Sequence, residues 1–155
     1  MPVPECRMAF RIFRDRSRMA REFSECITLS VCADCRRSRD RRRPGRAVAA
    51  ELAERLREWP FVAVEPGVCM GACEEPVAVA VQSPGRATYV FASLSDEAAV
   101  DSLVAFLALY RSRPDGMSRE AERPAGLRGH LRARIAPPEG GNRLSAADRA
   151  VEVSS

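Results

Sequence analysis

The chain has 155 residues, of which 46% are apolar and 30% charged, and its formal net charge is +4. This length gives one domain room for a hydrophobic core, and the longest apolar runs fall far short of the roughly 18 residues that span a membrane. Residues 1–25 also lack the apolar stretch of a secretory signal, because Arg or Glu interrupts them every few positions. We therefore expect a cytoplasmic protein.

Charge is distributed unevenly along the chain. All 25 basic residues are arginine, and the net charge is +7 over residues 1–46, −6 over residues 47–110 and +3 over residues 111–155. Basic segments of this kind suit either a solvated surface or a surface that meets an acidic partner. Apart from three phenylalanines in residues 1–25, they lack the interleaved aromatic side chains that stack on bases. We do not expect a nucleic-acid-binding protein.

The first half of the chain predicts a strand and then a helix. Residues 1–25 show no clean period and are expected to form an arginine-rich leader of uncertain order. From Ile27 to Val31, apolar and polar residues alternate as in a half-buried strand. An arginine-rich run follows at residues 36–43. Over residues 46–59 apolar side chains recur at four-residue intervals, which predicts a helix that Pro60 ends.

The next segment predicts three strands and a second helix. Residues 61–64 form a short apolar run that predicts the first of these strands. Val77–Val81 and Ala87–Phe91 are two further apolar runs, and the Pro-Gly pair between them favours a hairpin. A helix with one apolar stripe follows, for which Ser93 or Ser95 is the expected cap.

This order of elements, βαβ followed by ββα, predicts an α/β fold in which helices pack on a small mixed sheet. We expect the domain to span residues 26–110. Residues 111–138, which include a last extended piece at 131–135, are expected to wrap over the domain rather than extend its core. Residues 139–155 are small and polar and are expected to form a disordered tail.

A pair of cysteines follows each of the first two predicted strands. Cys32 and Cys35 come after the first strand, and Cys69 and Cys73 come after the second. A helical crossover between neighbouring strands makes the strands parallel, so both pairs are expected at the same end of the sheet. Cys26 lies at the other end of the first strand, about 20 Å from Cys32, and is not expected to join them.

Four thiolates without histidine suit either an iron-sulfur cluster or zinc. The 33 residues between the two pairs contain a whole helix and exceed the spacing of about 12–20 residues in common zinc motifs. Zinc nevertheless remains an alternative. A second alternative is a dithiol oxidoreductase in which Cys32 and Cys35 cycle as a disulfide, with their pKa lowered by nearby arginines. His130, the only histidine, is expected to be a surface residue.

The chain resembles the thioredoxin-like ferredoxins, and within them a branch of small bacterial predicted metal-binding proteins of unknown function. The resemblance runs from about residue 28 to residue 137. It rests on the segments Val31-Cys32-Ala-Asp-Cys35, Pro44-Gly45, Cys69-Met-Gly71-Ala-Cys73, Pro76-Val-Ala-Val-Ala, Gly85-Arg-Ala-Thr88-Tyr89-Val-Phe91, Asp115-Gly116, Arg123-Pro124 and Leu131-Arg-Ala-Arg134-Ile.

The resemblance implies a thioredoxin-like fold and a 2Fe-2S cluster held by Cys32, Cys35, Cys69 and Cys73. It also implies a role in electron transport for cobalamin or metal metabolism, and it raises the expectation of a cis proline at Pro76. An acidic redox partner would suit the basic segments, and a homodimer remains open. The chain shows no acid/base pair, nucleophilic triad or phosphate loop, so a ferredoxin-like carrier fits it better than a catalyst.

Overall fold

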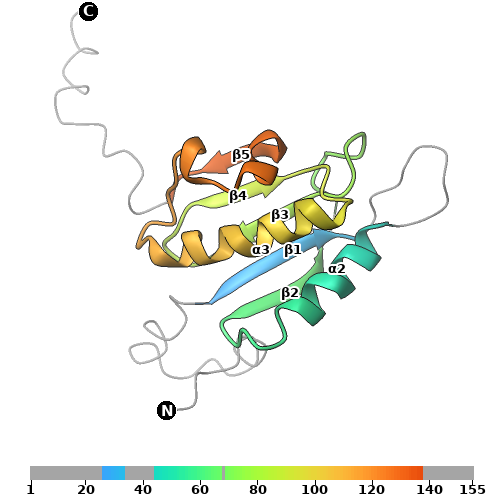
Figure 1. Ribbon diagram of the computed structural model, residues 1–155, viewed down its shortest axis with the longest axis horizontal. Coiled ribbons are helices and arrows are strands. Elements are labelled where there is room, and N and C mark those ends of the chain that lie inside the picture. The colour runs from blue at the N-terminus through green and yellow to red at the C-terminus, as the bar shows by residue number, and fades with distance from the viewer. Residues whose placement is uncertain (1–25, 34–43, 68, 138–155) are drawn as a thin grey trace, which may run out of the picture.

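The computed structural model describes residues 26–33, 44–67 and 69–137 (Figure 1). The predicted leader, the arginine-rich run and the predicted tail lie outside the described residues. The helices and strands, with η for a 3-10 helix, are β1 (Ile27–Cys32), α2 (Pro44–Arg55), β2 (Val62–Gly67), β3 (Val79–Gln82), β4 (Thr88–Phe91), α3 (Glu97–Ser112), η2 (Glu120–Glu122), η3 (Ala125–His130) and β5 (Leu131–Ile135).

In the described part of the chain, the strands form one mixed sheet in the order β2-β1-β3-β4-β5. β1 and β2 are parallel, whereas β3 is antiparallel to both β1 and β4, and β5 is antiparallel to β4. This confirms the α/β fold with βαβ followed by ββα, and the topology is thioredoxin-like. The helix between β1 and β2 is the crossover that makes these two strands parallel.

The core lies between the sheet and the two longer helices, which cover the same face of the sheet (Figure 1). Alternate residues of β1, beginning with Ile27, are fully buried and belong to the same apolar cluster as Leu52 of α2 and Phe106 of α3. Arg55 of α2 forms an ion pair with Asp101 of α3, which joins the two helices at the surface. No helix among the described residues has the length and apolar character needed to span a membrane.

The two helices begin differently from the sequence prediction. Helix α2 begins two residues earlier than expected, at Pro44, whose fixed φ angle suits the first turn of a helix. It ends at Arg55, before the expected stop at Pro60. Helix α3 is capped by Asp96, whose carboxylate accepts a hydrogen bond of 2.8 Å from the backbone N–H of Ala99. The predicted caps Ser93 and Ser95 were therefore wrong by one to three residues.

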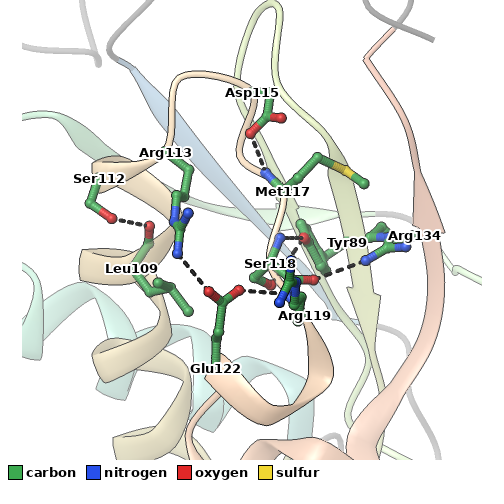
Figure 2. A network of polar contacts seen from close by, with 10 residues as sticks. All are labelled: Tyr89, Leu109, Ser112, Arg113, Asp115, Met117, Ser118, Arg119, Glu122 and Arg134. Atoms are coloured by element: carbon green, nitrogen blue, oxygen red, sulfur yellow. Dashed lines mark hydrogen bonds and ion pairs between the residues drawn. The ribbon is translucent and has the colours of Figure 1, made fainter.

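Residues 111–135 do more than wrap over the domain, which corrects the sequence prediction. Strand β5 extends the sheet beyond β4, and Leu127 is fully buried in the core. The buried hydroxyl of Tyr89 forms a hydrogen bond of 3.1 Å with the hydroxyl of Ser118 (Figure 2). It also accepts a hydrogen bond of 2.9 Å from the backbone N–H of Ser118. Arg134 of β5 donates to the carbonyl of Ser118 at 2.9 Å. These bonds fasten the segment to β4.

Gly116 is expected to be a sensitive position in this segment. Its φ is +66°, and an added Cβ would lie 2.7 Å from the ring of Tyr110 and 3.0 Å from Cβ of Arg86. We expect Gly116→Ala to lower the free energy of unfolding by about 2 kcal/mol, because backbone strain and a steric clash add together. Gly85→Ala is the matched control: its φ is +69°, but nothing lies within 4 Å of the added Cβ. If urea unfolding showed that both variants lose the same free energy of unfolding, the steric clash at Gly116 would be refuted.

Candidate metal centre

The ends of β1 and β2 place two of the cysteine segments side by side. In the parallel register of these strands, Cys32 is the partner of Gly67, so both strands finish at the same level. The backbone N–H of Ala33 donates to the carbonyl of Gly67 at 3.3 Å. The segment with Cys69 and Cys73 therefore begins beside Cys32, as the crossover argument predicted.

Cys69 and Cys73 lie close together and are both exposed. Their Sγ atoms are 3.2 Å apart, and the backbone N–H of Gly71 donates to the sulfur of Cys69 at 3.4 Å. Gly71 has a φ of +78°, a conformation that costs glycine little and other residues more. This glycine folds the short segment back on itself and so brings the two sulfurs together. We refer to residues 69–76 as the cysteine loop.

Cys32 lies beneath the cysteine loop. Only 1% of its surface is exposed, and it packs with Ala78 of the segment that leads into β3. Met70 and Ala72 of the loop pack against this pair. The backbone N–H of Cys32 donates to the carbonyl of Ala78 at 2.9 Å. One cysteine thus comes from the interior and two come from the solvent side.

The neighbouring sulfurs change the pKa of Cys73. The hydrogen bond with Cys69 is the largest cause that raises the pKa of Cys73 above its ordinary value of 9.0. The negative charge on Cys69, burial and the charge on Cys32 raise this pKa further. Because thiols bind metals as thiolates, a metal cation would have to displace the proton that this pair holds.

The fourth predicted ligand, Cys35, lies outside the described residues. Within the ranges the structure describes, no group of three or more His, Cys, Asp or Glu side chains is arranged to hold a metal ion. The four-cysteine set therefore stays a prediction, of which the structure brings together Cys69 and Cys73, with Cys32 below them. The chemistry of this donor set fits a soft metal centre, because thiolates are the ligands preferred by iron-sulfur clusters and zinc. Cys26 precedes β1, at the end opposite to Cys32.

Contacts with the start of β5 hold the other end of the cysteine loop. Arg132 forms a bidentate ion pair with Glu75, in which Nη2 and Oε1 are 2.8 Å apart. Nη1 of Arg132 also donates to the carbonyls of Gly129 at 3.0 Å and Leu131 at 3.2 Å, which fixes the guanidinium. The backbone N–H of Ser93 donates to the carbonyl of Glu75 at 2.8 Å. The sequence did not predict the ion pair between Glu75 and Arg132, because these residues are 57 positions apart.

His130 is half-buried rather than fully on the surface. One of its ring nitrogens lies 2.9 Å from the carbonyl of Ala92. The hydrogen bond from Arg132 is the largest cause that holds the pKa of Glu75 below its ordinary value of 4.5, and the electrostatic interactions with Arg132 and His130 lower this pKa further. The residue therefore belongs to the group of side chains that surrounds the end of the cysteine loop.

We expect Arg132→Gln to loosen the cysteine loop, because glutamine cannot form the bidentate ion pair with Glu75. Exchange of the Ser93 amide hydrogen, measured by mass spectrometry or NMR, should become severalfold faster. In the wild-type protein the ion pair requires an ionised Glu75, so it is present above pH 4.5 and is lost as the pH falls through the lowered pKa. Arg134→Gln, on the same strand, is the control. If the Ser93 amide hydrogen exchanged at the same rate in both variants and in the wild type, the ion pair would not hold the cysteine loop in place.

The peptide bonds around Pro76 differ from the expectation of a cis proline. A cis proline would have a cis Glu75–Pro76 bond, whereas the cis peptide bond found within the described residues is the next one, Pro76–Val77. The proline still stands between the cysteine loop and β3.

The fold and the site define a class: a small α/β protein with a thioredoxin-like sheet and cysteines gathered at the carboxyl ends of β1 and β2. The family model described as Protein of unknown function (DUF1636) matches residues 29–138, which is more than two thirds of the chain. The protein belongs to this family, and the match includes all four cysteines predicted as ligands. Searches of curated proteins and of solved structures found no significant match.

Proposed function

We propose that the protein is a small electron-transfer protein that holds a 2Fe-2S cluster through Cys32, Cys35, Cys69 and Cys73. The observation that carries the proposal is the 3.2 Å separation of the Cys69 and Cys73 sulfurs, in a loop whose Met70 and Ala72 pack against the buried Cys32. Clustered thiolates of this kind are the usual ligands of iron-sulfur clusters. When bound, the cluster would supply one-electron chemistry.

The residues of the chain have separate tasks in this proposal. Cys32 contributes a thiolate from a fully packed position, which excludes water from the inner side of the centre. Cys69 and Cys73 contribute thiolates from an exposed loop, so a redox partner can approach from their side. The amide of Gly71 donates to one of these sulfurs, and hydrogen bonds to sulfur help to set a cluster's reduction potential.

The basic side chains near the loop support an acidic redox partner. Arg132 of β5 pairs with Glu75 of the loop, and Arg128 of η3 and Arg134 of β5 are exposed in the same segment of the chain. Such a surface attracts an acidic partner and should make association fall with ionic strength. We place this electron transfer in the cytoplasm and in cobalamin or metal metabolism, as the resemblance to thioredoxin-like ferredoxins suggests. One chain supplies all four ligands, so the proposal needs no second copy.

Zinc is the second candidate, and it would use the same cysteines. The observation that favours it is the spacing, because two and three residues separate the cysteines within the pairs, which suits zinc knuckles. Zinc would stabilise the fold without redox chemistry. The dithiol alternative is less well supported, because an attacking thiol must be accessible and Cys32 is buried.

Metal analysis of anaerobically purified protein tests these candidates. A brown protein with about two irons and two sulfides per chain is the expected result. A colourless protein with one zinc per chain would refute the cluster and support the zinc-binding candidate. A colourless protein that takes up neither iron and sulfide nor zinc on anaerobic reconstitution would overturn both.

A further inference from the structure

The sulfurs of Cys69 and Cys73 are close enough to form a bond with each other. They are 3.2 Å apart, so closing a disulfide of about 2 Å would require a movement of only about 1 Å. Both cysteines are exposed, so no packed core side chain opposes this movement. The loop geometry therefore favours a link between these two cysteines.

Accessibility separates this pair from the third cysteine. Cys69 and Cys73 are exposed, whereas Cys32 has 1% of its surface exposed and is packed by Met70 and Ala72. A small oxidant in solution can reach the first two sulfurs and not the third.

We propose that Cys69 and Cys73 form a peroxide-reactive dithiol, whose reversible oxidation to a disulfide releases the metal. One sulfur attacks a peroxide oxygen, the O–O bond breaks, and a sulfenic acid and one water are formed. The second sulfur then attacks the sulfenic sulfur, the S–O bond breaks and a second water leaves. Two thiols lose two electrons in all, and hydrogen peroxide is reduced to two waters. A thiol reductant reverses the reaction.

The release of metal rests on the proposed function. A sulfur in a disulfide is no longer a thiolate, so oxidation removes two of the four proposed ligands at once. Reduction restores them. The state of this one pair would thus decide whether the centre is occupied, with Cys32 protected by its burial throughout.

Intact-mass analysis of the reduced, metal-free protein tests the dithiol directly. On addition of one equivalent of hydrogen peroxide, we expect a mass loss of two hydrogen atoms, reversed by dithiothreitol. Cys69 and Cys73 share the tryptic peptide 58–86, because no arginine lies between Arg57 and Arg86, so that peptide alone should lose the two hydrogens. Cys73→Ser should abolish the loss completely and leave a sulfenic acid on Cys69 that a 1,3-dione traps. Glu74→Gln, in the same loop, should react like the wild type.

The outcomes separate this inference from the proposed function. Peroxide that adds oxygen atoms to the peptide 58–86, or that links Cys69 or Cys73 to a cysteine outside this pair, overturns the inference even if the reduced protein binds iron or zinc. If the disulfide forms in a protein that binds neither metal when reduced, the dithiol is supported and the proposed centre is overturned. The full inference requires that oxidised protein takes up at least tenfold less metal than reduced protein, and that dithiothreitol restores uptake.

Discussion

The Gly45→Ala variant is expected to lose about 3 kcal/mol or more of its free energy of unfolding, at the upper end of the range for overpacked positions. An added Cβ would lie 1.9 Å from the carbonyl oxygen of Cys32 and 2.9 Å from its carbonyl carbon. Both atoms belong to the backbone, so no side-chain rotation can relieve the clash. The first turn of α2 and the end of β1 would have to move apart.

Helix propensity alone predicts that Gly45→Ala raises the free energy of unfolding. Alanine is favoured over glycine within helices by about 1 kcal/mol, which is too little to offset the clash. Gly129→Ala is a suitable control, because nothing lies within 4 Å of its added Cβ and its φ is not positive. We expect this control to change the stability by less than about 0.5 kcal/mol in urea unfolding. A stabilised Gly45→Ala variant would show that α2 does not touch the backbone of Cys32.

The same contact connects the fold to the proposed centre. The carbonyl of Cys32 lies against α2, while its amide donates to the carbonyl of Ala78, the residue before β3. Cys32 is therefore held from two sides by backbone atoms. A Gly45→Ala variant that still folds should bind metal more weakly, because it can accommodate the methyl group only by moving the backbone of this ligand.

The order and direction of the strands were predictable from local patterns. Alternation from Ile27 to Val31 predicted β1, and the apolar run at Val77–Val81 predicted β3, which begins two residues later, at Val79. The helix between β1 and β2 correctly predicted that these two strands are parallel. The position of Cys32 beside the cysteine loop follows from that topology. Each of these inferences needs only the period of the side chains and the handedness of the connection.

Contacts between distant segments were not predictable in the same way. The ion pair between Glu75 and Arg132 and the close approach of Gly45 to Cys32 depend on the packing of elements, which has no local sequence signal. Strand β5 was recognised as an extended piece, but its pairing with β4 depends on the free edge of that strand. The cap of α3 was misassigned because Ser93, Ser95 and Asp96 are all good capping residues.

Replacement of either exposed cysteine by serine is expected to lower the affinity for the bound metal by at least about 100-fold. Loss of a group that merely orients a ligand already costs about 10–100-fold, and here a ligand itself would be lost. Metal content and competition with a chelator measure the effect. Because Cys69 and Cys73 are exposed, the metal-free variants should remain within about 0.5 kcal/mol of the wild type in unfolding free energy.

Glu74→Gln provides the matched control for these two variants, since Glu74 is an exposed carboxylate in the same loop, immediately after Cys73. It removes one negative charge and leaves every sulfur in place, so we expect nearly unchanged metal content. If Glu74→Gln and Cys73→Ser weaken binding equally, the loop would attract the metal by charge alone. If Cys69→Ser and Cys73→Ser keep the wild-type metal content, the ligands lie elsewhere and the 3.2 Å sulfur pair is not part of a metal centre.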